Sequence, residues 1–102
     1  MPDYLSTFPP DQDVQVDIGK GHVAGLVLTS TSTTPGACEL YNYVGVGPPD
    51  ISDAIFVASV TAYSPVICLF NDRFAPRFPD GLWLHLSADC YLTLWHHVPL
   101  VT

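Results

Sequence analysis

Two adjacent histidines, His96-His97, are the residues whose type and spacing first suggest metal chemistry. Neighbouring residues on a β-strand point to opposite faces of the sheet, so these two imidazoles cannot easily share one ion. His85 and His97 could share a face, but they would lie far apart along the chain segments that carry them. Zinc requires several ligands at close spacing. We therefore predict no metal site and no cofactor.

Two acidic segments, 11–13 and 50–53, carry the oxygen ligands that calcium prefers. Neither segment contains the longer, fixed ligand set of an EF-hand loop. We interpret both segments as solvated turns.

Hydrolytic catalysis would need a Ser or Cys nucleophile near a His and an acid. All these residue types occur, but none of them stands in the sequence context of a nucleophile elbow. A pair of glycosidase carboxylates remains open on spacing alone, although Glu39 is the only glutamate. A chain of 102 residues is also small for a sandwich with a deep cleft. We predict that the protein is not an enzyme and that it has no catalytic residue.

Composition limits the possible partners. The net charge is −7, and Lys20, Arg73 and Arg77 are the only Lys or Arg residues. Nucleic-acid binding needs a basic surface, and so does binding to an anionic membrane, so we expect neither partner. Hydrophobic residues make up 48% of the chain and charged residues only 13%. Because so little charge is available for the surface, we expect a protein partner or a second copy to cover part of it.

The N-terminus has no basic or strongly apolar segment of the signal-peptide type, and no run of 18 apolar residues could form a membrane-spanning helix. Cys38, Cys68 and Cys90 are odd in number and widely spaced. They match neither a disulfide framework nor a zinc motif, so we expect reduced, apolar side chains in a protein made in the cytoplasm.

The elements that must position all these residues are short β-strands. Val, Thr, Tyr, Phe, Trp and Leu form the apolar stretches, helix-favouring residues are scarce, and turn residues recur often. The pattern predicts one all-β domain over residues 14–102, a small antiparallel β-sandwich of jelly-roll type with about eight strands. Strands are expected at 14–18, 22–30, 37–44, 54–63, 66–70, 81–86 and 90–97. In the first of them, Val14, Val16 and Ile18 are expected to share one face.

Residues 1–13 read as an extended arm. Three prolines interrupt regular structure, and three aspartates keep the segment solvated. Such an arm can become ordered on a neighbouring molecule. Tyr4 and Phe8 are therefore candidate interface residues.

The last two strands give the clearest pattern. A three-residue loop, 87–89, predicts a hairpin between 81–86 and 90–97, in which Asp89 takes the left-handed backbone position. In this register the Leu residues of both strands and Cys90 form one wholly apolar face. The opposite face would carry Trp83, His85, Tyr91, Thr93, Trp95 and His97, with Trp95 resting on Gly81.

That second face would expose several hundred Å² of aromatic surface, near the largest patch on a typical monomer. Trp and Tyr are frequent in interface hot spots. We therefore name Trp83, His85, Tyr91, Trp95 and His97 as interface candidates. The alternative is that the arm or the 45–53 loop of the same chain covers this face.

The layout resembles small structural proteins of tailed bacteriophages. The resemblance covers residues 14–98 and rests on the Gly-containing strand 21–28, the strand 37–43, the segment Phe78-Pro79-Asp80-Gly81-Leu82 and the closing strand 91–97. It implies a head decoration (cement) protein, an oligomer that binds the major capsid protein on the outside of the shell. The expected location is the virion surface, after assembly in the host cytoplasm.

This chain departs from that pattern in the many aromatic and His residues of its last strands. A tail or fibre component therefore stays open, and so does a glycan-binding sandwich that presents Trp and Tyr to sugar rings. The choice between a dimer and a trimer is also open.

Overall fold

The structure is a computed structural model that describes residues 4–30, 33, 35–47, 49–50, 52, 54–61, 65–71, 73 and 75–97. In this part of the chain nine β-strands form: β1 (Tyr4–Phe8), β2 (Gln12–Ile18), β3 (Gly21–Ser30), β4 (Gly36–Asn42), β5 (Ala54–Val60), β6 (Pro65–Leu69), β7 (Arg77–Phe78), β8 (Gly81–Leu86) and β9 (Cys90–His97). No helix among these residues is long and apolar enough to cross a membrane.

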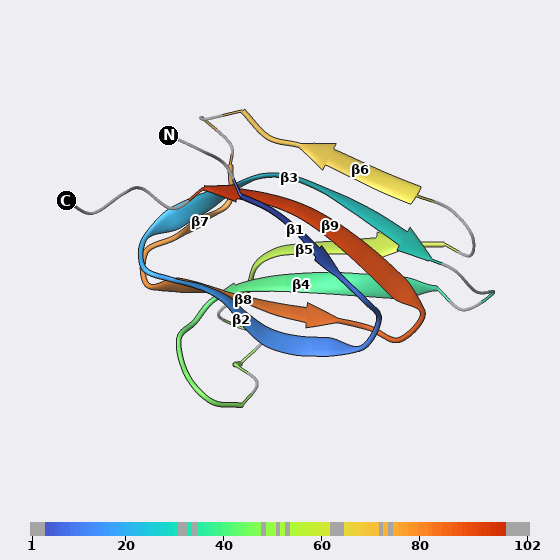
Figure 1. Cartoon of the computed structure of the whole chain (residues 1–102), viewed down its shortest axis with the longest axis horizontal. Coiled ribbons are helices and arrows are strands. Elements are labelled where there is room, and N and C mark those ends of the chain that lie inside the picture. Colours follow the sequence, from blue (N-terminus) through green and yellow to red (C-terminus); the bar gives the residue numbers. More distant parts are fainter. Residues whose placement is uncertain are drawn as a thin grey trace.

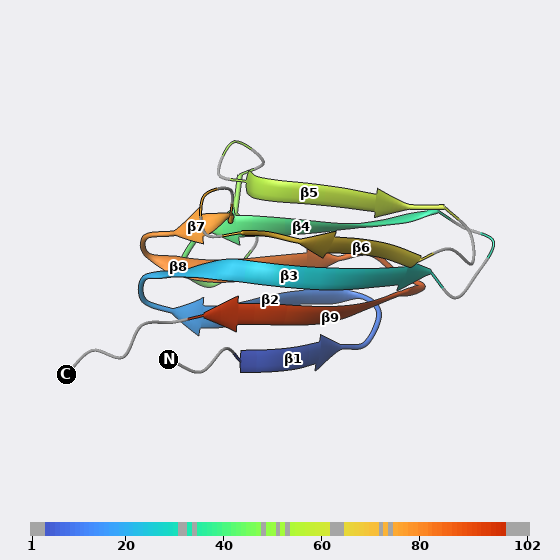
Figure 2. The ribbon, with the colours of Figure 1, turned by 90° about the horizontal axis from the view of Figure 1, so that it is seen from above.

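The strands form two antiparallel sheets that face each other (Figure 1). Sheet A has the order β1-β9-β3-β6, with the short β7 also paired to β3, and sheet B has the order β2-β8-β4-β5. Figure 2 shows β1, β9, β3 and β6 in that order across the molecule. The predicted small all-β sandwich is confirmed.

The pairing of the strands is nested along the chain. Apart from the two-residue β7, the first strand pairs with the last, β2 with β8, β3 with β6, and β4 with β5. A long hairpin that is rolled up on itself gives this order, and the result is a jelly roll of eight main strands. The predicted jelly-roll type therefore agrees with the observed strand order.

The core lies between the two sheets and is built mainly from leucines. β8 and β9 supply the alternate residues that were predicted to be apolar. All of them are buried: Leu82, Leu84, Leu86, Cys90, Leu92 and Leu94. The other fully buried core residues are Val23, Leu26, Leu28, Cys38, Leu40 and Phe78.

The predicted hairpin between 81–86 and 90–97 is wrong. The two strands have the predicted bounds, but β8 belongs to sheet B and β9 to sheet A, so they face each other across the core. Loop 87–89 crosses from one sheet to the other, and Asp89 does have a positive φ of 68°. Alternate leucines meet in either arrangement, side by side or face to face, so the hydrophobic pattern does not distinguish the two.

The arm predicted for residues 1–13 also differs from the structure. Residues 4–8 form β1, which pairs with β9 from Tyr4–His96 to Phe8–Leu92, and β2 already begins at Gln12. Phe8 packs against the core. Pro9 and Pro10 lie between the two strands and Asp11 has a positive φ of 63°, so this proline-rich segment is a turn from sheet A to sheet B. Residues 1–3 lie outside the described part.

A β-bulge in β2 changes the face on which its last residues lie. The register with β8 shifts between Gln15 and Asp17, so Asp17 pairs with the buried Leu82. Ile18, predicted to share a face with Val14 and Val16, is 73% exposed instead. A bulge adds one residue to a strand and so reverses the alternation that follows it.

Candidate functional site

The outer surface of sheet A carries one continuous set of uncharged side chains. The register aligns Leu5 with Trp95, Gly25 and Leu69 in one row across the four strands. The next row holds Thr7, Thr93, Val27 and Ile67, and the third holds Tyr91, Thr29 and Pro65. We call the outer surface of these three rows the apolar face. None of its side chains is charged.

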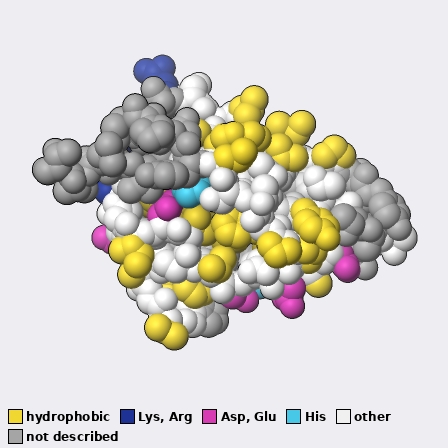
Figure 3. Space-filling model, viewed as in Figure 1, with side chains coloured by type: hydrophobic (Ala, Val, Ile, Leu, Met, Phe, Trp, Pro, Cys, Tyr) yellow, Lys and Arg dark blue, Asp and Glu magenta, His cyan; other side chains and the backbone are white. Residues whose placement is uncertain are grey.

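Several of these side chains are open to solvent. Leu5 is 60% exposed, Ile67 65% and Leu69 78%. Hydrophobic side chains gather on the side of the molecule where β6 lies (Figure 3). Singly exposed hydrophobic residues are normal on a monomer, but a contiguous uncharged set across a whole sheet indicates a contact surface.

Gly25 shapes the middle of the apolar face. A Cβ at this position would lie 3.0 Å from Leu69 Cδ2, 3.1 Å from the Cys68 carbonyl oxygen and 3.6 Å from Trp95 Cε3. Leu69 and Trp95 therefore close over the glycine from the two neighbouring strands. The predicted contact of Trp95 with a glycine does occur, but the glycine is Gly25 and not Gly81.

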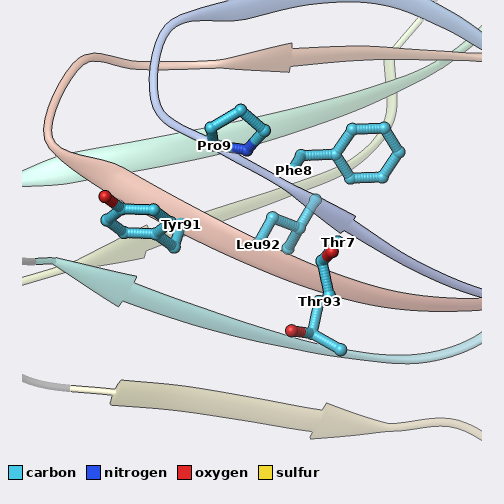
Figure 4. A pocket seen from close by; sticks show the side chains of 6 residues that line it. All are labelled: Thr7, Phe8, Pro9, Tyr91, Leu92 and Thr93. Atoms are coloured by element: carbon cyan, nitrogen blue, oxygen red, sulfur yellow. The ribbon is translucent and has the colours of Figure 1, made fainter.

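A pocket of about 320 Å³ lies beside the apolar face, where β1 runs into its turn (Figure 4). Its lining comes from β1, the following proline and β9: Thr7, Phe8, Pro9, Tyr91, Leu92 and Thr93. The Tyr91 ring is half exposed at this pocket, with the hydroxyl groups of Thr7 and Thr93 nearby.

The structure divides the predicted aromatic face between two surfaces. Tyr91 and Trp95 lie on the apolar face of sheet A, whereas Trp83 and His85 lie on the outer surface of sheet B. The side chains of Tyr4 and His97 lie outside the described part. The division follows from the crossing of β8 and β9 into different sheets.

Trp83 is covered by its own chain, as the alternative interpretation expected. Only 5% of it is exposed, and the Tyr43 ring meets it edge-on at a centroid distance of 5.4 Å. The Gln15 side-chain amide donates hydrogen bonds to the carbonyl oxygens of Tyr43 (2.8 Å) and Leu82 (3.0 Å), which fastens this segment to β8. The same Gln15 side chain also holds the start of the 45–53 loop, because Gly45 N–H donates a hydrogen bond to Gln15 Oε1 at 3.3 Å.

His85 belongs to a polar and acidic surface. Its Nδ1 lies 2.7 Å from Asp13 Oδ1, and both side chains are nearly half exposed. In the register His85 also pairs with Glu39, which accepts a hydrogen bond of 2.6 Å from the Tyr41 hydroxyl group. The two outer surfaces therefore differ: the apolar face of sheet A is uncharged, with Arg77 of β7 beyond its three rows, whereas sheet B carries the acidic Asp13 and Glu39.

A third arrangement lies between the sheets and was not predicted. His96 is 4% exposed, its Nδ1 is 2.5 Å from Asp17 Oδ2, and its Nε2 is 2.8 Å from Ser6 Oγ. A carboxylate only accepts, so Nδ1–H donates to Asp17 and, in the neutral imidazole, the Ser6 hydroxyl group donates to Nε2. These three residues have the connectivity of a Ser-His-Asp catalytic triad.

The sequence contains these three residue types, but no pattern in it indicates that Ser6, Asp17 and His96 lie together. Ser6 and His96 are 90 positions apart and meet only because β1 pairs with β9. Asp17 turns inward only because of the bulge before it. Neither feature leaves a short motif in the sequence.

The described residues contain no group of three or more His, Cys, Asp and Glu side chains suited to a metal ion. The three cysteines are free. Burial raises the pKa of the Cys38 thiol to about 12, so this cysteine stays protonated at neutral pH and is a poor nucleophile.

Comparison of the chain with protein-family models, with curated proteins and with solved structures gave no match.

Proposed function

We propose that this chain is a structural protein of a tailed-phage particle, a decoration (cement) protein that binds the major capsid protein through its apolar face. The observation that carries the proposal is the uncharged apolar face of sheet A, with Leu5, Ile67 and Leu69 more than half exposed. The phage assignment rests on the sequence resemblance described above.

The difference between the two outer surfaces indicates which side of such a protein faces its partner and which side faces water. The acidic outer surface of sheet B, with Asp13 and Glu39, is well hydrated and suits the side that faces water. Transfer of the apolar face from water into a protein contact lowers the free energy. A shell surface with exposed apolar side chains is therefore the partner that fits this face.

The small size of the apolar face predicts that a single copy binds its partner weakly and that several linked copies bind it more tightly. Complete burial of three aliphatic side chains contributes at most about 5–9 kcal/mol. Association itself costs on the order of 4–15 kcal/mol. One contact would thus be weak, whereas a dimer or trimer on a symmetric shell binds by avidity.

The test is binding of the purified chain to empty phage shells, measured by co-sedimentation. Ile67→Asp places a charge in the apolar face and is expected to reduce binding at least tenfold. Val57→Asp is the matched control, because Val57 is also exposed on a strand, but in sheet B. Analytical ultracentrifugation of the same samples measures the oligomeric state. Equal binding by both variants, or no binding by the wild type, would refute the proposal.

One observation favours a second function. The pocket at Tyr91 places an exposed aromatic ring beside two threonine hydroxyl groups, an arrangement that suits a sugar ring. Apolar stacking and a few polar groups are the usual elements of small-ligand sites. The alternative proposal is therefore a glycan-binding module, as in a tail or fibre component.

A glycan array separates the two proposals. A glycan-binding module should bind a defined set of sugars, and Tyr91→Ala should abolish this binding while Val57→Asp retains it. An array without hits, together with binding to shells, would leave the decoration protein as the function.

A further inference from the structure

We propose that Ser6 is a reactive nucleophile that small activated esters acylate, with His96 as the general base and Asp17 as the residue that positions it. This activity goes beyond protein binding and uses a different part of the molecule from the apolar face.

The order of the hydrogen bonds carries the proposal. Asp17 Oδ2 accepts from His96 Nδ1–H at 2.5 Å, which leaves the unprotonated Nε2 of the neutral imidazole directed at Ser6 Oγ, 2.8 Å away. A general base must lie within about 2.6–3.2 Å of the group whose proton it accepts. The 2.8 Å between His96 Nε2 and Ser6 Oγ meets this condition without any rearrangement of the chain.

The His96 side chain is more deeply buried than its two partners. The His96 side chain is 5% exposed and that of Asp17 14%, while Ser6 is only partly buried. β1 and β2 are the edge strands of their sheets, so Ser6 and Asp17 lie along one open edge of the sandwich. The base is thus shielded from water, whereas Ser6 and Asp17 are only partly buried at this edge.

The backbone of β1 offers donors for the negative charge that develops on the ester oxygen. In an edge strand every second N–H points away from the neighbouring strand. Either the N–H of Ser6 or those of Leu5 and Thr7 therefore point outward next to the nucleophile. Such donors stabilise the oxyanion of a tetrahedral intermediate.

The reaction needs no component besides these side chains, the ester and water. Ser6 Oγ attacks the carbonyl carbon as its proton passes to His96 Nε2, and the ester C–O bond then breaks. An alkoxide takes the proton from His96 as it leaves, whereas a stable phenolate leaves without it and His96 then releases the proton to water. In both cases His96 is neutral again and Ser6 remains as an acyl ester. Water, deprotonated by His96, then attacks this ester and releases the carboxylic acid and free Ser6.

The substrate class follows from the position of Ser6 on an edge strand. The pocket lined by Thr7 and Phe8 does not include Ser6. An ester with a short acyl group and a good leaving group fits this edge, because the rest of the molecule can stay in solvent.

The test uses the full chain with a fluorophosphonate probe and, separately, with 4-nitrophenyl acetate. Mass spectrometry of the folded wild type is expected to place the phosphonyl group on Ser6. Ser6→Ala should lose this label, and Ser59→Ala, a change at an exposed strand serine of sheet B, should keep it. Because general-base catalysis contributes about 10²–10⁴-fold, His96→Gln should slow labelling at least 100-fold.

Two further measurements separate chemistry from folding. Asp17→Asn retains an acceptor for Nδ1–H, so circular dichroism should show a folded protein, while ester hydrolysis falls at least tenfold. Ser6→Cys should restore a nucleophile that the same ester acylates. The proposal is overturned if the folded wild type takes up no probe, if the label spreads evenly over the serines, or if folded Asp17→Asn reacts as fast as the wild type.

Discussion

Asp17 on β2 and His96 on β9 form a hydrogen bond of 2.5 Å that joins sheet B to sheet A. A second His–Asp pair, His85 with Asp13, has a similar separation of 2.7 Å but lies on the surface within sheet B. The chain thus contains the same chemical pair in two environments.

The two pairs are expected to differ in their effect on stability. Asp17→Ala leaves the buried Nδ1–H of His96 without its acceptor, and we expect a loss of about 2–3 kcal/mol in the free energy of unfolding. Asp13→Ala removes an exposed ion pair and should cost less than about 1 kcal/mol. Urea denaturation of both variants measures the difference. Equal losses would show that burial of His96 does not decide the cost.

Gly36 is expected to tolerate no side chain. A Cβ on Gly36 would overlap Cys90 Sγ and lie 2.9 Å from Ser87 Oγ. Ser87 also accepts a hydrogen bond from Ala37 N–H at 2.9 Å, so it cannot move away freely. Gly36→Ala should therefore destabilise the fold by about 1–3 kcal/mol.

Thermal unfolding by circular dichroism checks the effect of Gly36→Ala. Gly47→Ala is not a suitable control, because the positive φ of 96° at Gly47 strains any side chain by itself. The double variant Gly36→Ala/Cys90→Ala is better, because it removes the sulfur atom that the new methyl group meets. Recovery of part of the lost stability would support the steric explanation, and a larger loss would contradict it.

The indole N–H of Trp83 is buried and has no hydrogen-bond partner among the described residues. A buried donor without an acceptor carries a cost of roughly 1–3 kcal/mol, which a phenyl ring does not have. Trp83→Phe is therefore expected to change stability by less than about 1 kcal/mol. Trp83→Ala creates a cavity and should cost about 3–5 kcal/mol.

Urea titrations followed by far-ultraviolet circular dichroism measure both Trp83 variants, since the intrinsic fluorescence changes with the substitution itself. A loss for Trp83→Phe as large as that for Trp83→Ala would show that the indole N–H has an acceptor, such as a bound water molecule.

Stability is expected to fall at alkaline pH. Burial raises the pKa of Cys38 from 9.0 to about 12, and burial together with the Glu39 hydrogen bond raises that of Tyr41 from 10.0 to about 12. Above pH 9 for Cys38 and above pH 10 for Tyr41, and below about pH 12 for both, the unfolded chain has largely lost the proton and the native chain largely still holds it. The native state binds more protons, so the free energy of unfolding decreases as pH rises through this window.

Urea midpoints at pH 8.0 and 10.5 measure the alkaline effect, and tyrosinate absorbance follows Tyr41 directly. Cys38→Ala lacks the buried thiol and should show a smaller decrease between the two pH values. An identical decrease would mean that Cys38 does not contribute.

The sequence alone was sufficient for the fold class and for most strands. Alternation of apolar residues marks the bounds of β8 and β9 correctly, because period-two burial is a local property of each strand. The apolar side of β8 and of β9 was also correct, and Leu84 and Leu92 are buried. Asp89 takes the left-handed backbone conformation expected of it.

Which strands pair with each other was decided by the tertiary structure. The same alternation permits β8 to pair with β9 or to face it across the core, and only the rolled-up jelly roll decides between them. That decision separated Trp83 from Trp95, brought Trp95 into one row with Leu5 and Leu69, and placed Tyr91 on the same face.

What the sequence by itself determined is thus a small acidic β-sandwich with an apolar core and aromatic outward residues. The tertiary structure decided which of those residues share a surface, and it brought Ser6, His96 and Asp17 of β1, β9 and β2 into one hydrogen-bonded group. The physical reason is that burial acts on each strand locally, whereas contacts between strands depend on sheet order and on a single bulge that turns Asp17 inward.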